Sequence, residues 1–496
     1  MDCLAPLLDD NAAYQAVAAR DARFDGRLFV GVTSTGIYCR PICRVRTPMR
    51  QNCRFFQTPA QAEAAAFRPC MKCRPEIAPG PGLAWTVMDA SRTLACQAGA
   101  ALDALAAGGD SPRLTQVAAR LGISDRHLRR IFQAEHGVTP GQYLQTRRLL
   151  LAKQLLTDTG LPVARVANAS GFGSLRRFNA AFAEHYRMSP SRLRGADSAV
   201  VFDAHAAVAV TLAYRAPLDV DALLRFFAQR AIPGVEQVAG RRIRRSLRAG
   251  SVAAAAGWIE AEFVVGAPLV RLRFAPELAS ASGAVNAAAR RWLDLDADPH
   301  VIDAALADLP GAPGLRLPGS LDMFELAVRA VLGQQVTVTA ARTLARRVVE
   351  RFGDTVAAPW ADVSRGFPAP ATLASAPLEA IAELGIIRGR AAAIQALAQD
   401  WPAIAAQLAP AGSAPALIER LCALPGIGPW TAHYIAMRAL GWPDAFPPND
   451  VAVLKAMRLR HGPLTPRAAL ALASRWQPWR SYAVLRLWNS LQKDLV

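Results

Sequence analysis

Four cysteines near the start of the chain have the spacing of a metal site. Cys39 and Cys43 form one pair, Cys70 and Cys73 form a second, and 26 residues separate the pairs. Two thiol pairs in one short segment are typical of a tetrahedral zinc site. Thiolates without a nearby histidine favour zinc over harder cations. The pattern therefore predicts a zinc site with four cysteine ligands, and a purely structural zinc is one interpretation of it.

A second group of residues near the other end could act on DNA. Gly426 and Gly428, in LPGIG, let backbone N–H groups approach a phosphate. A tight turn between helices also needs glycine for steric reasons alone. Asp450 follows two prolines at an expected helix start, where its carboxylate could do chemistry or simply cap the helix.

The charge of the chain fits a polyanionic partner. The 496 residues carry a net charge of +18, and residues 20–74 hold 11 Lys or Arg against three Asp or Glu. The cysteines outside the quartet are scattered, which argues against a disulfide framework and favours a reducing compartment. We find no secretory signal or membrane span in the sequence. We therefore expect a cytoplasmic, nucleoid-associated protein.

Four segments must position these residues. We expect a cysteine module at 1–80 that ends in the linker PEIAPGPG, a helical domain at 85–195, a strand-rich α+β domain at 200–285 and an all-α domain at 286–496. The predicted fold class is multidomain and mainly α with α+β parts. It comprises a small α/β zinc module, an all-α double helix-turn-helix, the strand-rich domain and the C-terminal helical domain.

The helical domain contains an internal duplication with a period of about 50 residues. Each copy has a short helix, a Gly turn, a Ser start and a second helix that carries arginine. This order is typical of a helix-turn-helix, in which Ser caps the recognition helix that enters the major groove. The candidate DNA-binding residues are Arg126, Arg129 and Arg130 in the first copy and Arg176, Arg177 and Asn179 in the second.

The duplicated segment, with GFGSLRRFNAAFAEHYRMSPSRLR, resembles the AraC-type DNA-binding domain. Leu175 replaces the aromatic residue usual at the start of the second recognition helix. The cysteine module, with GVTSTGIYCRPIC and FRPCMKCRP, resembles the N-terminal domain of the Ada family. That resemblance implies zinc bound by Cys39, Cys43, Cys70 and Cys73, and methyl transfer from a DNA methylphosphotriester to Cys39.

The methyl transfer implied by this resemblance has a physical rationale. Four thiolates on one divalent ion leave a formal charge of about −2, and methylation of Cys39 brings it to about −1. The change removes part of the repulsion between the site and DNA inside a shell of arginines. Repair would thus switch on DNA binding, with the helix-turn-helix pair selecting a promoter.

The C-terminal half resembles the HhH-GPD superfamily of DNA glycosylases. The sequences PGLRLPGSLDMFELAVRAVLGQQVTVTAAR and RWQPWRSYAVLRLW narrow the match to the AlkA type, from about Pro217 to Leu487. The resemblance implies hydrolytic release of alkylated purines such as 3-methyladenine, with Asp450 as the catalytic carboxylate. It also implies an aromatic slot, formed by Trp430, Tyr434, Trp488 and Phe226, and a DNA-contacting hairpin with Gly426 and Gly428.

Several features limit this resemblance. Trp430 stands where lyase members carry lysine, so we expect water as the nucleophile, and the cysteine count excludes an iron–sulfur cluster. Gln335 stands where the AlkA type carries an apolar wedge, the residue that fills the base stack of DNA. The Pro-Cys-His-Arg motif of O6-alkylguanine repair is absent from the sequence. A monovalent cation at the hairpin is a further expectation. The expected partners are double-stranded DNA and, during activation, RNA polymerase, for a monomer that contacts no membrane.

A different class of function remains open at this point. The chain could be a transcription regulator with a structural zinc, whose glycosylase-like half only holds DNA. The presence of Asp450 and the aromatic slot favours the enzyme.

Overall fold

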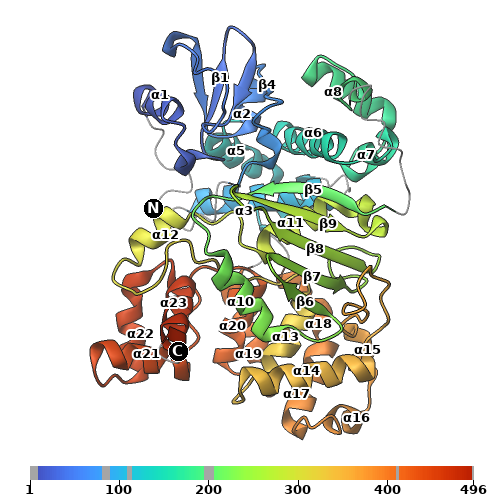
Figure 1. The fold of residues 1–496 in the computed structure, drawn as a ribbon, viewed down its shortest axis with the longest axis vertical. Coiled ribbons are helices and arrows are strands. Elements are labelled where there is room, and N and C mark those ends of the chain that lie inside the picture. The colour runs from blue at the N-terminus through green and yellow to red at the C-terminus, as the bar shows by residue number, and fades with distance from the viewer. Residues whose placement is uncertain (1–8, 81–89, 109–113, 195–205, 409–412, 494–496) are drawn as a thin grey trace. The chain divides into compact units, whose positions relative to one another are not determined.

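The computed structural model describes residues 9–80, 90–108, 114–194, 206–408 and 413–493 (Figure 1). The chain divides into two compact units. Unit 1 comprises residues 1–216 and 264–287, and unit 2 comprises residues 217–263 and 288–496. Helices predominate and the strands form small groups, which confirms the mainly α, multidomain class. The end of the linker expected after the cysteine module lies outside the described residues.

The cysteine module of unit 1 is built on a small mixed sheet with the strand order β3-β1-β2-β4. Strand β1 pairs antiparallel with β2 and β3, whereas β2 and β4 are parallel. Thr58 caps α2 and Asp9 caps α1. The elements are α1 Asp10–Ala18, η1 Ala22–Phe24, β1 Phe29–Val32, β2 Ile37–Cys39, η2 Arg50–Asn52, β3 Cys53–Phe56, α2 Pro59–Ala64, β4 Arg68–Pro69 and η3 Pro75–Ile77.

The rest of unit 1 is mainly helical, as the duplication predicts. Two helix pairs, α4–α5 and α7–α8, are joined by the 19-residue helix α6 (Figure 1). Thr139 starts α6 with a capping box, in which Thr139 and Gln142 bond each other's backbone N–H groups. The helices are α3 Ala90–Gly108, α4 Leu114–Arg120, α5 Asp125–His136, α6 Pro140–Asp158, α7 Val163–Ala169, α8 Leu175–Tyr186 and α9 Pro190–Arg194.

Unit 1 also holds an antiparallel strand pair, β5 Val208–Ala213 with β9 Leu269–Phe274, and the 3-10 helix η4 Pro276–Ala281. Helix α6 binds this strand pair through polar side chains. Gln154 donates to the carbonyl of Thr211 at 2.8 Å, and the Thr211 N–H donates to Asp158 at 3.1 Å. The centre of unit 1 is therefore α6, which contacts the sheet and both helix pairs.

Unit 2 begins with helix α10 Val220–Arg230 and the antiparallel meander β6 Glu236–Ala239, β7 Arg242–Leu247 and β8 Gly257–Phe263. These elements lie in the segment that the sequence predicts to be a strand-rich α+β domain, although the four residues of β6, EQVA, show no strong alternation. A buried ion network holds the meander to helix α13. Arg245 pairs with Glu325 at 2.5 Å, and Arg329 pairs with Glu236 at 2.8 Å.

The remaining helices of unit 2 pack around two apolar cores. One core is centred on α13, α17 and α20, and the other on α21 and α23. Tyr434 packs against the first core, whereas Phe226 and Trp488 pack against the second. The predicted aromatic slot therefore lies where the two cores meet. Helix α11 Ser282–Trp292 begins in unit 1 and ends in unit 2. The other helices of unit 2 are α12 Pro299–Ala305, α13 Met323–Leu332, α14 Val338–Phe352, α15 Pro370–Ser375, α16 Leu378–Ala382, α17 Arg388–Gln399, α18 Trp401–Gln407, α19 Ala414–Cys422, α20 Pro429–Ala439, α21 Val451–His461, α22 Pro466–Ala473, η5 Ser474–Trp476 and α23 Arg480–Lys493.

Candidate metal centre, DNA-binding helices and base pocket

The four predicted ligand cysteines converge in the cysteine module. The sulfurs of Cys39, Cys43, Cys70 and Cys73 all lie within 4.8 Å of one another. Cys39 ends β2, and the N–H of Cys70 donates to the carbonyl of Tyr38 at 2.9 Å, which fixes the second pair beside the first. A tetrahedral zinc with Zn–S bonds of about 2.3 Å places its sulfurs roughly 3.8 Å apart. The quartet therefore fits zinc.

The chemistry of the four thiols supports the same conclusion. Hydrogen bonds with Cys43 and Cys70, together with burial, raise the pKa of the Cys39 thiol. Four sulfurs this close, three of them in buried cysteines, cannot all be thiolates at neutral pH without a cation, because their charges repel. Cys53 is also buried but stands apart from the quartet, and its thiol donates to the carbonyl of Met49 at 3.3 Å.

The arginines around the quartet fall into two groups. Arg40 is 4% exposed, and its guanidinium binds the carboxylate of Asp25 and the carbonyl of Cys73. Arg74 pairs with Asp158 at 2.6 Å and also with Glu76. These two arginines stabilise the module, so they differ from the DNA-facing shell that the sequence suggested. The exposed basic residues of this region are Arg44, Arg46, Arg54 and Lys72.

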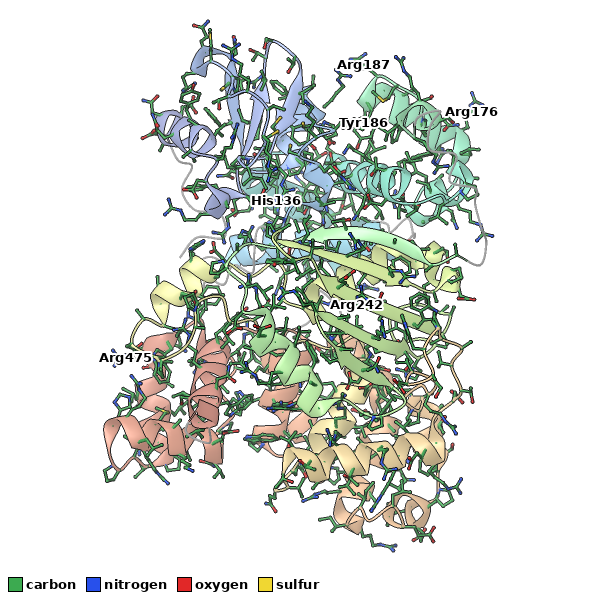
Figure 2. The ribbon with its side chains drawn as sticks, in the orientation of Figure 1. His136, Arg176, Tyr186, Arg187, Arg242 and Arg475 are labelled. Carbon is green, nitrogen blue, oxygen red and sulfur yellow. The ribbon has the colours of Figure 1, made fainter. Side chains whose placement is uncertain are left out.

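Both predicted recognition helices have the expected cap. The hydroxyl of Ser124 accepts the N–H of His127 at the start of α5, and the hydroxyl of Ser174 accepts the N–H of Arg177 at the start of α8, each at 3.2 Å. Figure 2 shows Arg176 at the outer edge of the second helix pair. All six predicted DNA-binding residues are exposed: Arg126, Arg129, Arg130, Arg176, Arg177 and Asn179. Leu175 is 44% exposed beside them.

A buried carboxylate joins the cysteine module to the second recognition helix within unit 1. Glu63 of α2 accepts hydrogen bonds from Tyr38 at 2.9 Å and Thr146 at 2.7 Å, and its other contact is His185 of α8 at 2.5 Å. Lys153 of α6 pairs with Glu76 at 2.6 Å, and both side chains are almost fully buried. Sequence reasoning missed these contacts because no short-range pattern links the partners.

The stability of unit 1 should depend on pH through His185. Burial lowers the pKa of His185, but the hydrogen bond and charge of Glu63 outweigh burial and raise it above its usual value. A raised folded-state pKa stabilises the unit fully below the unfolded pKa of about 6.5, and this contribution is lost as pH rises through the folded pKa. We expect the difference in urea midpoint between wild type and His185→Gln to be largest at acidic pH and to shrink towards pH 8.5. A difference that does not change with pH would contradict this assignment.

The predicted DNA hairpin lies between α19 and α20. Gly426 has φ = +78°, which glycine adopts readily, and a Cβ there would meet Ala393 at 2.9 Å. Gly428 caps α20, has open space around it and leaves the helix N-terminus accessible, as phosphate binding requires. Gln334 donates to the carbonyl of Gly426 and to Thr431, both at 2.9 Å. Gln335 is exposed with φ = +53°, an uncommon conformation for a residue with a side chain.

Asp450 combines the two roles that the sequence left open. One carboxylate oxygen, Oδ1, accepts the N–H of Val453 at 2.8 Å and so caps α21. The same oxygen accepts the indole N–H of Trp488 at 3.1 Å, and Oδ2 accepts the indole N–H of Trp430 at 2.8 Å. Asp450 is 7% exposed. Two aromatic rings of the predicted slot thus fix the orientation of the carboxylate.

The indole clamp on Asp450 can be tested by removing one N–H while keeping an aromatic ring. Hydrogen bonds to charged groups contribute about 1.5–3 kcal/mol. We therefore expect Trp488→Phe to slow base release from alkylated DNA by roughly tenfold to a hundredfold, with little change in DNA affinity. Single-turnover rates and binding titrations measure the two effects. Trp476→Phe is the matched control, because Trp476 donates at 3.2 Å to Asp308 instead. Equal losses in both variants would exclude the clamp.

The aromatic slot contains two cations that the sequence did not reveal. Trp430 and Tyr434 are stacked, with ring centroids 5.3 Å apart and planes at 8°. The guanidinium carbon of Arg230 lies 3.8 Å from the ring centroid of Phe226, and that of Arg438 lies 4.8 Å from it. Each arginine follows its aromatic partner by four residues, Phe226–Arg230 and Tyr434–Arg438. This helical spacing is the pattern from which they could have been found.

Profiles of four known domain families match the chain in order. They are the metal binding domain of Ada at residues 12–76, a helix-turn-helix domain at 117–196, the AlkA N-terminal domain at 209–322 and the HhH-GPD superfamily base excision DNA repair protein at 328–480. Together with the four-cysteine site and the glycosylase fold, they define a DNA repair protein that combines a metal-binding regulator with a glycosylase.

Full-length similarity places the chain in one family. It is 36% identical over 501 residues to the "Probable bifunctional transcriptional activator/DNA repair enzyme AlkA" of Mycobacterium tuberculosis (strain ATCC 25618 / H37Rv), covering 98% of this chain and 97% of the relative. The chain belongs to this family of bifunctional transcriptional activator/DNA repair proteins.

Two further relatives each match one part of the chain. DNA-3-methyladenine glycosylase 2 of Escherichia coli (strain K12) is 34% identical over 56% of this chain and 96% of its own length. The bifunctional transcriptional activator/DNA repair enzyme Ada of the same strain is 35% identical over 33% of this chain, and the match spans 44% of that protein.

These findings establish the general nature of the protein. It has an Ada-type zinc site, a helix-turn-helix DNA-binding domain and an HhH-GPD DNA glycosylase domain, so DNA is its partner. Among the described residues, no helix is long and apolar enough to cross a membrane. The monovalent cation expected at the hairpin stays a prediction.

Proposed function

We propose that the cysteine module repairs methylphosphotriesters in DNA by transferring the methyl group to Cys39. The observation that carries this proposal is the quartet of cysteine sulfurs that lie within 4.8 Å of one another. A bound zinc keeps such sulfurs deprotonated at neutral pH. The Cys39 sulfur forms a bond to the methyl carbon as the carbon–oxygen bond of the triester breaks, and the phosphate regains its negative charge.

The transfer makes Cys39 the reporter of the lesion. The sulfur becomes a neutral thioether with no easy route back, so each protein reacts once. Cys39 is 5% exposed, which means that its sulfur must become accessible when DNA docks. One negative charge is lost from the quartet, and the exposed cations Arg44, Arg46 and Lys72 then hold DNA more tightly.

The helix-turn-helix domain links the methylation of Cys39 to the recognition of a promoter. Its two capped recognition helices, α5 and α8, present their arginines to the major grooves of a promoter. The methylated protein then activates transcription by contact with RNA polymerase, and it acts as a monomer. The buried contacts of Glu63 and Glu76 with α6 and α8 hold the sensor and this domain as one body within unit 1.

We further propose that unit 2 excises alkylated bases of the 3-methyladenine type by hydrolysis. The observation that carries this is the Asp450 carboxylate, which is held by two indoles of the slot. The hairpin binds the DNA backbone, and the damaged base is flipped out of the duplex into the aromatic slot. Gln335 fills the gap that the flipped base leaves in the base stack. Asp450 stabilises positive charge on the sugar and positions water, because a cationic base leaves without an acid.

One sample tests both proposals. Wild-type protein is incubated with methylated duplex DNA, free bases are measured by chromatography, and the protein is digested for mass spectrometry. We expect released 3-methyladenine and one added methyl on the Cys39 peptide. If no base is released, the glycosylase-like half only holds DNA. If the four thiols remain unmodified while DNA still binds, the zinc is purely structural.

A further inference from the structure

The cysteine module contacts the two recognition helices at corresponding positions. His136 is the last residue of α5 and Tyr186 is the last residue of α8, and the two occupy the same place in the duplicated copies, 50 residues apart (Figure 2). The side-chain amide of Gln61 donates to the carbonyl of His136 at 3.1 Å. Nη1 of Arg68 donates to the carbonyl of Tyr186 at 3.4 Å.

Both donors suit the ends of helices. The last carbonyls of a helix have no partner within it, and the helix dipole makes that end negative. The Gln61 amide is fixed in orientation, because its oxygen accepts the N–H of Gln57 at 2.9 Å. Gly137, which follows α5, has φ = +69°, and a Cβ there would meet the amide nitrogen of Gln61 at 3.0 Å. The missing side chain at Gly137 therefore allows the module to approach α5 closely.

The same helix of the module supplies a third contact. Glu63 follows Gln61 by two residues on the six-residue helix α2, and it is 6% exposed. Its carboxylate contacts His185 of α8 at 2.5 Å and accepts the hydroxyl of Thr146 in α6 at 2.7 Å. Helix α2 is thus connected to α5, α6 and α8, and Arg68 of β4 adds a second connection to α8.

These contacts leave the DNA-binding ends of the helices free. A recognition helix contacts base edges mainly with residues near its N-terminal end. The module holds the opposite ends, and all six predicted DNA-binding residues are exposed. Helix α6 joins the two copies along the chain, and the module joins them a second time. Two bodies joined at two places cannot rotate freely against each other, so the separation of the recognition helices is fixed.

We infer that Gln61, Glu63 and Arg68 hold the two recognition helices at one separation, so that the cysteine module determines which half-site spacing in a promoter the helix-turn-helix domain reads. The separation of two recognition helices sets the spacing of the half-sites that they can bind together. The three residues position α5 and α8 and do not contact bases. This role rests on the promoter recognition proposed above and does not depend on methyl transfer.

The test measures tolerance to a change in half-site spacing. Duplexes are selected from a random-sequence pool by the zinc-loaded wild-type chain, before and after exposure to methylated DNA. We expect the selected sites to contain two half-sites at a single spacing. One base pair inserted between them moves the second half-site by about 3.4 Å and rotates it by roughly 35°. We expect wild type to bind the inserted duplex about tenfold to a hundredfold more weakly than the selected one.

Variants of the module should change this penalty. The double variant Gln61→Leu with Arg68→Met removes both donors and keeps side chains of similar size. We expect its penalty for the inserted base pair to fall below about threefold, because the helices can then follow the half-sites. Arg68→Lys keeps a cation at the end of α8 and should retain most of the wild-type penalty. Arg23→Met is the matched control for lost charge, because Arg23 pairs instead with Asp21 of the same module at 2.5 Å.

Zinc content and thermal midpoints establish that the variants are folded, and if the double variant is not, each single variant should lower the penalty by a smaller factor. A wild-type penalty in the folded donor variants would overturn the inference, as would wild-type sites without a fixed spacing. If wild type selects no motif in either state, promoter recognition fails and the role of the three residues falls with it. If a motif is selected but Cys39 gains no methyl, only the methyl-transfer proposal fails.

Discussion

Asp450→Asn will abolish nearly all base release while leaving DNA binding intact. The amide keeps an oxygen to cap α21, so the fold around Val453 persists, but the negative charge next to the sugar is gone. Loss of one preorganised group at a developing charge slows the reaction by about 10²–10³-fold, and loss of a full charge should reach the upper end of that range. Single-turnover release from duplex DNA containing one alkylated purine measures the effect.

The control for this variant is another helix cap in the same unit. Asp219 caps α10 by accepting the N–H of Ala222 at 2.9 Å, and it is not part of the aromatic slot. We expect Asp219→Asn to release base at close to the wild-type rate. If Asp450→Asn does so as well, Asp450 is only a cap and another group must stabilise the sugar.

Cys39→Ser will remove both methyl uptake and the gain in promoter binding that follows it. A serine hydroxyl is a poor nucleophile and a poor zinc ligand, so the variant has no methyl acceptor. For wild type, loss of one charge near the DNA backbone corresponds to about 1 kcal/mol per close phosphate, so affinity should rise roughly thirtyfold when two phosphates are near. Mass spectrometry and binding titrations before and after exposure to methylated DNA measure the two effects.

Another cysteine of the same module, Cys53, provides a control for the Cys39→Ser variant. Cys53 is as buried as Cys39, but its sulfur lies outside the quartet. We expect Cys53→Ser to take up one methyl and to gain promoter affinity as wild type does. If Cys39→Ser still gains a methyl on another sulfur of the quartet, the acceptor has been misassigned although the repair reaction stands.

Local sequence patterns were enough to predict much of the site. Cys39 to Cys73, the caps Ser124 and Ser174, and Asp450 before α21 each depend on neighbours within a few residues or on a familiar spacing. The helical segments could likewise be predicted from the periodic spacing of their apolar residues. Strand β6 could not be located in this way, because it is defined by its pairing with β7 and its own four residues carry no clear strand pattern.

The contacts that tune the site could not be predicted, because they join residues far apart in the chain. Arg40 directly follows Cys39 in a strongly basic segment, yet Asp25 holds it inside the module. Arg438 reaches the carbonyl of Pro318, 120 residues away, and its hydrogen bond to the Tyr434 hydroxyl depends on that fixed position. Burial decides whether a charge serves structure or function, and burial is a property of the packed fold.

The buried pair of Lys153 and Glu76 bears on how such proteins evolve. Lys153 belongs to α6, whereas Glu76 follows the last cysteine of the quartet, and each loses a buried counter-charge if the other segment is replaced. A buried charge without its partner is strongly destabilising. Recombination that joins the cysteine module of another protein to this helix-turn-helix domain would therefore give poorly folded chains, unless Lys153 and Glu76 are both kept. We therefore expect the two segments to be inherited as a pair, although separate sequence profiles match them.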